Sequence, residues 1–146
     1  MAHSRQHHQQ TRRAALWVLY LIDVAGAEPA DALATSRATM TELEPGLAEH
    51  WSLVEQRVNG VFELWDEVND YVQSVSPRWK IARMAPVDRN ILRLGAWELV
   101  YGQLETPIAV IDHCVELGKE YGEKSTSGFV NGLLDQLCRD KDISLR

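Results

Sequence analysis

The stretch SGFVNGLLDQL, residues 127–137, carries two conflicting structural signals. Its Asn-Gly pair is typical of a tight turn. However, Phe129, Leu133 and Leu137 recur at every fourth position, and the apolar residues that follow them widen the stripe on one side of a helix. This spacing predicts an uninterrupted helix, in which Gly132 costs about 1 kcal/mol of helix propensity relative to alanine. We expect another helix to approach closely at Gly132, which would explain the glycine.

Helical spacing of apolar residues recurs along the whole chain, and no segment alternates apolar and polar residues for long enough to predict a strand. Proline and glycine residues separate the helical segments. The expected helices span residues 11–24, 30–43, 47–75, 79–84, 86–101, 107–121 and a last segment that begins between 125 and 127. We therefore predict an all-α fold of about seven helices.

The domain organisation follows from chain length and from the position of Pro77. A chain of 146 residues fits one compact domain. We expect a flexible basic arm over residues 1–10 and one helical domain over residues 11–146. Because Pro77 interrupts the helical sequence near its middle, the domain is expected to divide into two packed bundles, at about residues 11–76 and 77–140.

Composition excludes several classes of protein. There is no long apolar run and no signal-type apolar segment, so we expect a soluble cytoplasmic protein without membrane contact. Cys114 and Cys138 lie within apolar helical patterns and are interpreted as buried thiols. His3, His7 and His8 fit a histidine-containing arm as well as a metal site. We expect no native metal site and no cofactor.

Charge is distributed unevenly along the chain. The net charge of −6 argues against indiscriminate coating of nucleic acid, but residues 1–22 contain three arginines, three histidines and no acid. Residues 78–93 hold five basic residues against one acid, whereas residues 42–70 hold eight acids against one arginine. A helix dipole disfavours basic residues in the first turn, so Arg12 and Arg13 either bind a partner or phosphate, or are simply solvated.

The sequence lacks the motifs of common catalytic sites. It contains no glycine-rich phosphate loop, no GxSxG and no HExxH. Asp112, His113 and Cys114 are adjacent on a helix and cannot converge on one point. We therefore predict a non-enzymatic protein. The N-terminus of the last helix could attract a phosphate, and Phe129 in its first turn could either stack on an unpaired base or cap the core.

Four segments together resemble the NusB transcription antitermination family. They are RRAALWVLYLIDV, PVDRNILRLGAWEL, TPIAVIDHCVELGKEYG and STSGFVNGLLDQL, in that order and spacing. The chain is also similar to the N-terminal domain of RsmB-type rRNA cytosine methyltransferases. No methyltransferase domain follows in this sequence, so we expect the stand-alone factor.

The resemblance implies a fold, a function and a set of contact residues. It implies two helical bundles that bind single-stranded boxA-type RNA together with the ribosomal protein NusE, join transcribing RNA polymerase and support processive synthesis of ribosomal RNA. RNA contacts are implied for Arg5, His8, Arg12, Arg13, Lys124, Ser125, Ser127 and Phe129. NusE contacts are implied for Tyr20 and Asp88, although Tyr20 could be core and Asp88 could cap a helix or pair with Arg89 or Arg93.

The sequence departs from the family pattern at two places. Its N-terminal arm has fewer arginines than many members, and Ser125 replaces an acidic residue often found before the last helix. Both departures suggest weaker RNA affinity or stronger dependence on the partner. Two alternatives remain: a protein–protein scaffold, including a homodimer that occludes the RNA surface, and a module that positions rRNA for a separate methyltransferase.

Overall fold

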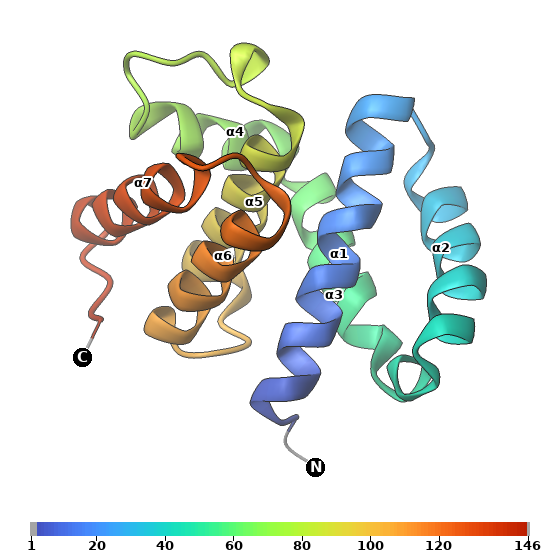
Figure 1. The fold of residues 1–146 in the computed structure, drawn as a ribbon. Helices are drawn as coiled ribbons and strands as arrows, with labels where there is room; N and C mark the ends of the chain where they lie inside the picture. The colour runs from blue at the N-terminus through green and yellow to red at the C-terminus, as the bar shows by residue number, and fades with distance from the viewer. Residues whose placement is uncertain (1–2, 146) are drawn as a thin grey trace.

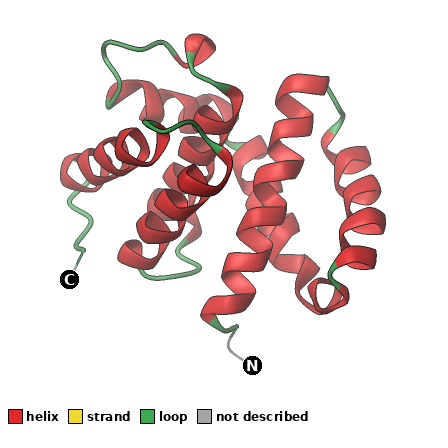
Figure 2. Ribbon diagram, viewed as in Figure 1, coloured by secondary structure: helices red, strands yellow, loops and turns green. Residues whose placement is uncertain are grey.

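The structure is a computed structural model that describes residues 3–145, all of them in helices, turns and loops (Figure 2). The α-helices are α1 (Arg5–Ala25), α2 (Pro29–Leu43), α3 (Trp51–Glu63), α4 (Trp65–Ser74), α5 (Pro86–Trp97), α6 (Pro107–Tyr121) and α7 (Thr126–Asp140). Two short 3₁₀ helices, η1 (Pro45–His50) and η2 (Ile81–Arg83), and a π-helical turn, η3 (Glu98–Gly102), complete the elements. The predicted all-α fold is confirmed. No helix in this part of the chain is both long and apolar enough to cross a membrane.

The helices form two bundles that share α1 as a common wall (Figure 1). α1 packs against α2 and α3 on one side and against α5 on the other, while α4, α6 and α7 surround α5. The boundary between the bundles differs from the expected one at Pro77. At Leu64 the backbone leaves helical geometry (φ −113°, ψ 34°), so the segment expected as one long helix becomes α3 and α4. α4 buries Val68 and Val72 and packs against α5, which places it in the C-terminal bundle.

α1 begins at Arg5, in the segment that was expected to be a flexible arm. Ser4 is the N-cap residue: its hydroxyl oxygen accepts a hydrogen bond from the His7 backbone N–H, and His7 Nδ1 accepts one from the Ser4 N–H. This reciprocal pair is a capping box with histidine at the third helical position, where glutamate or glutamine is usual. The cap extends α1 through residues 5–10.

Glycines mark the close approaches between helices, but not at the position that the sequence suggested. α7 runs without a break through Asn131 and Gly132, which confirms the expected helix. Gly132 is exposed, and a methyl group there would meet no atom within 4 Å, so the expected close contact at Gly132 is wrong. The tightest of several close contacts lies at Gly60 of α3, where a Cβ atom would overlap the indole ring of Trp97. The indole ring packs directly on this turn of α3.

We expect Gly60→Ala and Gly132→Ala to change stability in opposite directions. The first variant forces Trp97 to move in a close-packed core, which costs about 1 to 3 kcal/mol. The second variant adds a methyl group in open space on a helix and gains about 0.5 to 1 kcal/mol. Urea unfolding of both variants measures the two effects, and equal effects would contradict the packing described for Gly60.

Candidate nucleic-acid interface

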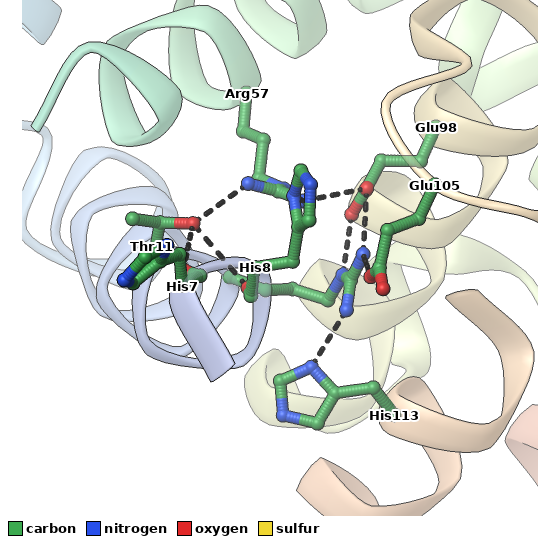
Figure 3. A network of polar contacts seen from close by, with 8 residues as sticks. His7, His8, Thr11, Arg57, Glu98, Glu105 and His113 are labelled. Atoms are coloured by element: carbon green, nitrogen blue, oxygen red, sulfur yellow. Dashed lines mark hydrogen bonds and ion pairs between the residues drawn. The ribbon is translucent and has the colours of Figure 1, made fainter. Parts of the chain in front are cut away.

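A buried polar network lies between the two bundles, and Figure 3 shows Arg57, Glu98 and His113 within it. Arg12 makes most of the network's hydrogen bonds. Its Nε and Nη2 donate to the two carboxylate oxygens of Glu98 at 2.6 and 2.8 Å, and Nη2 also donates to Glu105 Oε1 at 2.7 Å. Arg57 Nη2 donates to Glu98 Oε1 at 3.0 Å, and Arg57 Nη1 donates to Thr11 Oγ1 at 2.8 Å. The network therefore joins α1, α3 and η3.

The pKa values of the side chains in this network depend on burial and on the charges of their neighbours. Burial alone would raise the pKa of Glu98, but Arg12 and Arg57 outweigh burial and lower that pKa to about 2. Burial, and then the charge of Arg12, lowers the pKa of His113 to about 3. Burial and Arg57 likewise lower the pKa of His8. Both imidazoles are therefore neutral near pH 7, and each accepts a hydrogen bond from an arginine at Nδ1, at 2.8 Å for His113 and 3.0 Å for His8.

Two of the eight expected RNA contacts are corrected by this geometry. Arg12 is fully buried and His8 is 6% exposed, and the Arg12 guanidinium and Nδ1 of His8 are held by partners inside the protein. Neither can reach a phosphate without breaking the network. A basic residue in the first turn of a helix suggested an external anion, but the partner of Arg12 is Glu98, 86 positions further along the chain.

Arg13, the neighbour of Arg12, forms no hydrogen bond within this network among the described residues. Its side chain is about one third exposed, and its Nε lies 3.7 Å from Glu120 Oε2 in a loose ion pair. Arg5 is exposed at the start of α1. Lys124 and Ser125 are exposed in the loop before α7, and Ser127 is half-buried. These residues remain accessible to a ligand.

Phe129 and Ser125 line a hollow of about 290 Å³ at the start of α7. Its other lining residues are Trp79, Arg83, Met84, Ala85 and Asp88, and the whole set is called the aromatic hollow below. Phe129 is half-buried and Trp79 is 61% exposed. The structure thus brings two expected RNA contacts beside Asp88, an expected partner contact.

Asp88 connects the two helices that line this hollow, α5 and α7. Its Oδ1 accepts a hydrogen bond from Thr126 Oγ1 at 2.9 Å, and the same Thr126 oxygen accepts one from the Glu123 N–H at 2.9 Å. The first turn of α7 is thereby tied to α5. Of the alternatives left open for Asp88, the structure supports the structural contact with a helix start and shows no ion pair with Arg89 or Arg93 among the described residues.

The aromatic hollow includes two residues that were not identified from the sequence, Trp79 and Arg83. Arg89 and Arg93 of the same basic segment bind Asp23 at 2.6 and 2.9 Å, whereas Arg83 makes no ion pair within the described part of the chain. Arg78 and Lys80 are likewise exposed and without an ion pair there. The available signal was an aromatic residue between basic residues in a proline-bounded loop, a pattern typical of single-stranded nucleic-acid contacts.

Tyr20, the second expected partner contact, is half-buried on α1. Its ring packs edge-on against Trp17 at a centroid distance of 5.9 Å, and Trp17 also packs against Tyr121 at 5.4 Å. Trp17 itself is 40% exposed. Tyr20 is therefore part of an aromatic surface on α1 that reaches both the core and the solvent.

Comparison with known proteins identifies the family. The NusB family model matches residues 9–139. The chain belongs to the NusB family. The transcription antitermination protein NusB of Sorangium cellulosum (strain So ce56) is 40% identical over 130 residues, which cover 88% of this chain and 89% of that protein. NusB of Myxococcus xanthus (strain DK1622) is 37% identical, over 87% of this chain and 91% of that protein.

Solved NusB structures share the fold. A crystal structure of the antitermination factors NusB and NusE in complex with dsRNA superposes with a TM-score of 0.82 at 24% identity, over 92% of this chain and 98% of that one. The solution structure of NusB from Aquifex aeolicus superposes with a TM-score of 0.77 at 25% identity, over 97% of this chain and 93% of that one.

Membership in a family of transcription antitermination proteins confirms that the chain is not an enzyme.

Replacement of each of the two neighbouring arginines of α1 by alanine should change the stability of the fold by very different amounts. Arg12→Ala leaves Glu98 and Glu105 without their main partner and should cost about 3 to 5 kcal/mol. Arg13→Ala removes a loose, partly exposed pair and should change stability by less than about 1 kcal/mol. Denaturant unfolding of the two variants tests this, and a small effect of Arg12→Ala would contradict the network.

His113 should make the fold sensitive to acid. Its pKa is lower in the folded chain than in the unfolded chain, so the unfolded chain takes up the proton first and stability is lost as the pH falls below about 6.5. The expected loss between about pH 7 and pH 5 is about 2 kcal/mol. His113→Asn keeps an acceptor for Arg12 but cannot titrate, so the unfolding free energy should fall less over this range. An equal fall in both proteins would contradict the assignment.

Proposed function

We propose that this NusB family member is an RNA-binding transcription antitermination factor that binds single-stranded boxA-type RNA together with the ribosomal protein NusE. In this role it joins transcribing RNA polymerase in the cytoplasm and supports processive synthesis of ribosomal RNA. Two findings support the proposal: its relatives are transcription antitermination proteins, and a NusB of the same fold has been solved with NusE and dsRNA.

The observation that carries the RNA part of the proposal is the aromatic hollow. Trp79 offers an exposed ring beside the half-buried Phe129, and stacking of a base on one such ring is worth about 1 to 3 kcal/mol. Because a ring can stack only on a base that is not covered by its neighbours, the hollow favours unpaired RNA over a duplex. The double-stranded RNA of the solved NusB–NusE complex belongs to that protein and does not set the preference of this chain.

Phosphate contacts in this proposal come from cations around the hollow and on α1. Arg78, Lys80 and Arg83 are exposed in the loop between α4 and α5, and Lys124 is exposed in the loop before α7. Arg5 and Arg13 would add contacts from α1, in place of the buried Arg12. On a chain of net charge −6, these local groups must supply the attraction to RNA.

NusE is proposed to contact Tyr20 on α1 and Asp88 on α5. These two helices pack against each other, and Asp88 also lines the aromatic hollow. A partner on this surface would therefore lie beside the bound RNA and could touch both. Such an arrangement would let RNA and partner bind cooperatively, in keeping with the dependence on NusE that is expected from the small number of arginines in the N-terminal arm.

A homodimer is the second candidate, and a second hollow on the surface favours it. Apolar side chains of Trp17, Met40, Leu43 and Tyr121 line this hollow together with Arg13. Leu43 is 78% exposed, an unusual exposure for leucine. A second copy that covered these side chains would also cover Arg13 and reduce RNA binding. Concentration-dependent RNA affinity, with a dimer in sedimentation, would favour this candidate.

We expect Trp79→Ala and Phe129→Ala each to weaken binding of boxA-type RNA in the presence of NusE by about 5- to 150-fold, the equivalent of one lost stacking contact. Phe62→Ala is the matched control, because Phe62 is also an exposed aromatic residue (44%) but lies on α3, away from the hollow. Fluorescence anisotropy with labelled RNA measures the affinities, and circular dichroism verifies folding.

The RNA affinity of the unaltered chain should also fall as salt rises, with a logarithmic slope of about −0.7 for each phosphate contact. Arg83→Gln should make this slope shallower by one contact. The proposal would be rejected if the complex with NusE bound boxA-type RNA no more tightly than a scrambled RNA, or if the two hollow variants behaved like Phe62→Ala.

A further inference from the structure

Three histidines meet where the start of α1 lies beside the end of η1. His3 precedes α1 and His7 lies in the first turn of α1. His50 is the last residue of η1 and directly precedes α3. One ring nitrogen of each lies within 4.8 Å of the ring nitrogens of the other two. His3 Nδ1 and His50 Nδ1 are 3.2 Å apart, although the residues are 47 positions apart in the chain. These three residues are called the histidine cluster.

The spacing fits a metal ion between two of the rings. Two nitrogens that each lie about 2.0 to 2.1 Å from a tetrahedral zinc ion are separated by about 3.3 to 3.4 Å. The His3–His50 nitrogen distance of 3.2 Å is close to this value, and their rings are nearly perpendicular, at 82°. The two nitrogens are hydrogen-bonded to each other, so an ion would replace the shared proton, and both rings must turn for the two lone pairs to face that ion.

His7 requires a larger adjustment to become the third ligand. Its ring stacks on that of His50 at a centroid distance of 3.5 Å and an interplanar angle of 25°, so their lone pairs do not yet converge. The His7 Nδ1 atom accepts the exposed Ser4 N–H at 3.1 Å. An ion at this nitrogen would replace one exposed hydrogen bond. The side chain is only half-buried, which leaves room for its ring to turn.

The two histidines outside the cluster are held by hydrogen bonds to arginines. Of the five histidines, His8 and His113 each have Nδ1 hydrogen-bonded to a buried arginine. The histidine cluster contains the other three, and no such hydrogen bond to an arginine is formed by them among the described residues. Three imidazole nitrogens with a position open for water suit zinc, copper or nickel rather than magnesium or calcium.

We propose that His3, His7 and His50 bind one divalent transition-metal ion, with zinc as the physiological type. The ion joins the first turn of α1 to the residue before α3 and so holds the N-terminal turns of α1, which carry Arg5, against the bundle. The sequence alone predicted no metal site, because His50 is isolated in the sequence and only the fold brings it to the other two. This inference does not depend on the proposed RNA function.

Calorimetric titration of zinc chloride into the untagged full-length chain at neutral pH tests the site. We expect one ion per chain, and we expect His3→Ala, His7→Ala and His50→Ala each to weaken binding by at least about tenfold. Glu49→Ala is the control, since it removes an exposed carboxylate next to His50 and should leave the affinity unchanged. His3 is exposed, so its variant tests the site without endangering the fold.

Thermal unfolding supplies a second readout. Zinc should raise the unfolding midpoint of the unaltered chain increasingly with concentration, and should raise the midpoint of His50→Ala clearly less at each concentration. Binding should weaken in acid, because protons compete for the same nitrogens. Several weak ions per chain, or a zinc affinity that the three histidine variants share with the unaltered chain, would overturn the proposal.

Discussion

The buried ion pair between Arg12 and Glu98 is the interaction on which the rest of the structure depends. Both side chains are inside the protein, and the charges of Arg12 and Arg57 outweigh burial and keep Glu98 ionised. Arg57 shares the same carboxylate, so a single acid of η3 holds one arginine from α1 and one from α3. Removal of Glu98 would leave the buried Arg57 without its carboxylate partner, and removal of Arg12 would leave Glu98 with Arg57 alone, so the pairing favours one relative position of the two bundles.

A second tie between the bundles uses the same chemistry near the other end of α1. Asp23 accepts hydrogen bonds from Arg89, Asn90 and Arg93 of α5, and these contacts, which outweigh the effect of burial, lower its pKa. Two ties along one helix leave α1 little freedom to shift or rotate. The arginines of both ties are held in buried or partly buried ion pairs, so their positive charges are not available on the surface.

The cations that remain free are concentrated in loops and at helix ends. In Figure 1 the loop that precedes α5 lies at the top of the molecule and the start of α1 lies at the bottom. The first region carries the aromatic hollow and the second carries the histidine cluster, so the two proposed sites occupy different ends of a rigid helical frame. A ligand bound at one site would therefore not touch the other site.

The sequence by itself determined the helices, because apolar periodicity and the positions of proline and glycine are local properties. It also indicated the family, and it singled out Phe129 at the start of the last helix as a candidate RNA contact, which stays a prediction. Only the tertiary structure decided that Arg12 is buried while Arg13 is accessible, that the close-contact glycine is Gly60, and that His50 joins two N-terminal histidines. Each of these outcomes depends on a partner distant in the sequence, and the one-residue break at Leu64 that redirects α4 carries no strong local signal.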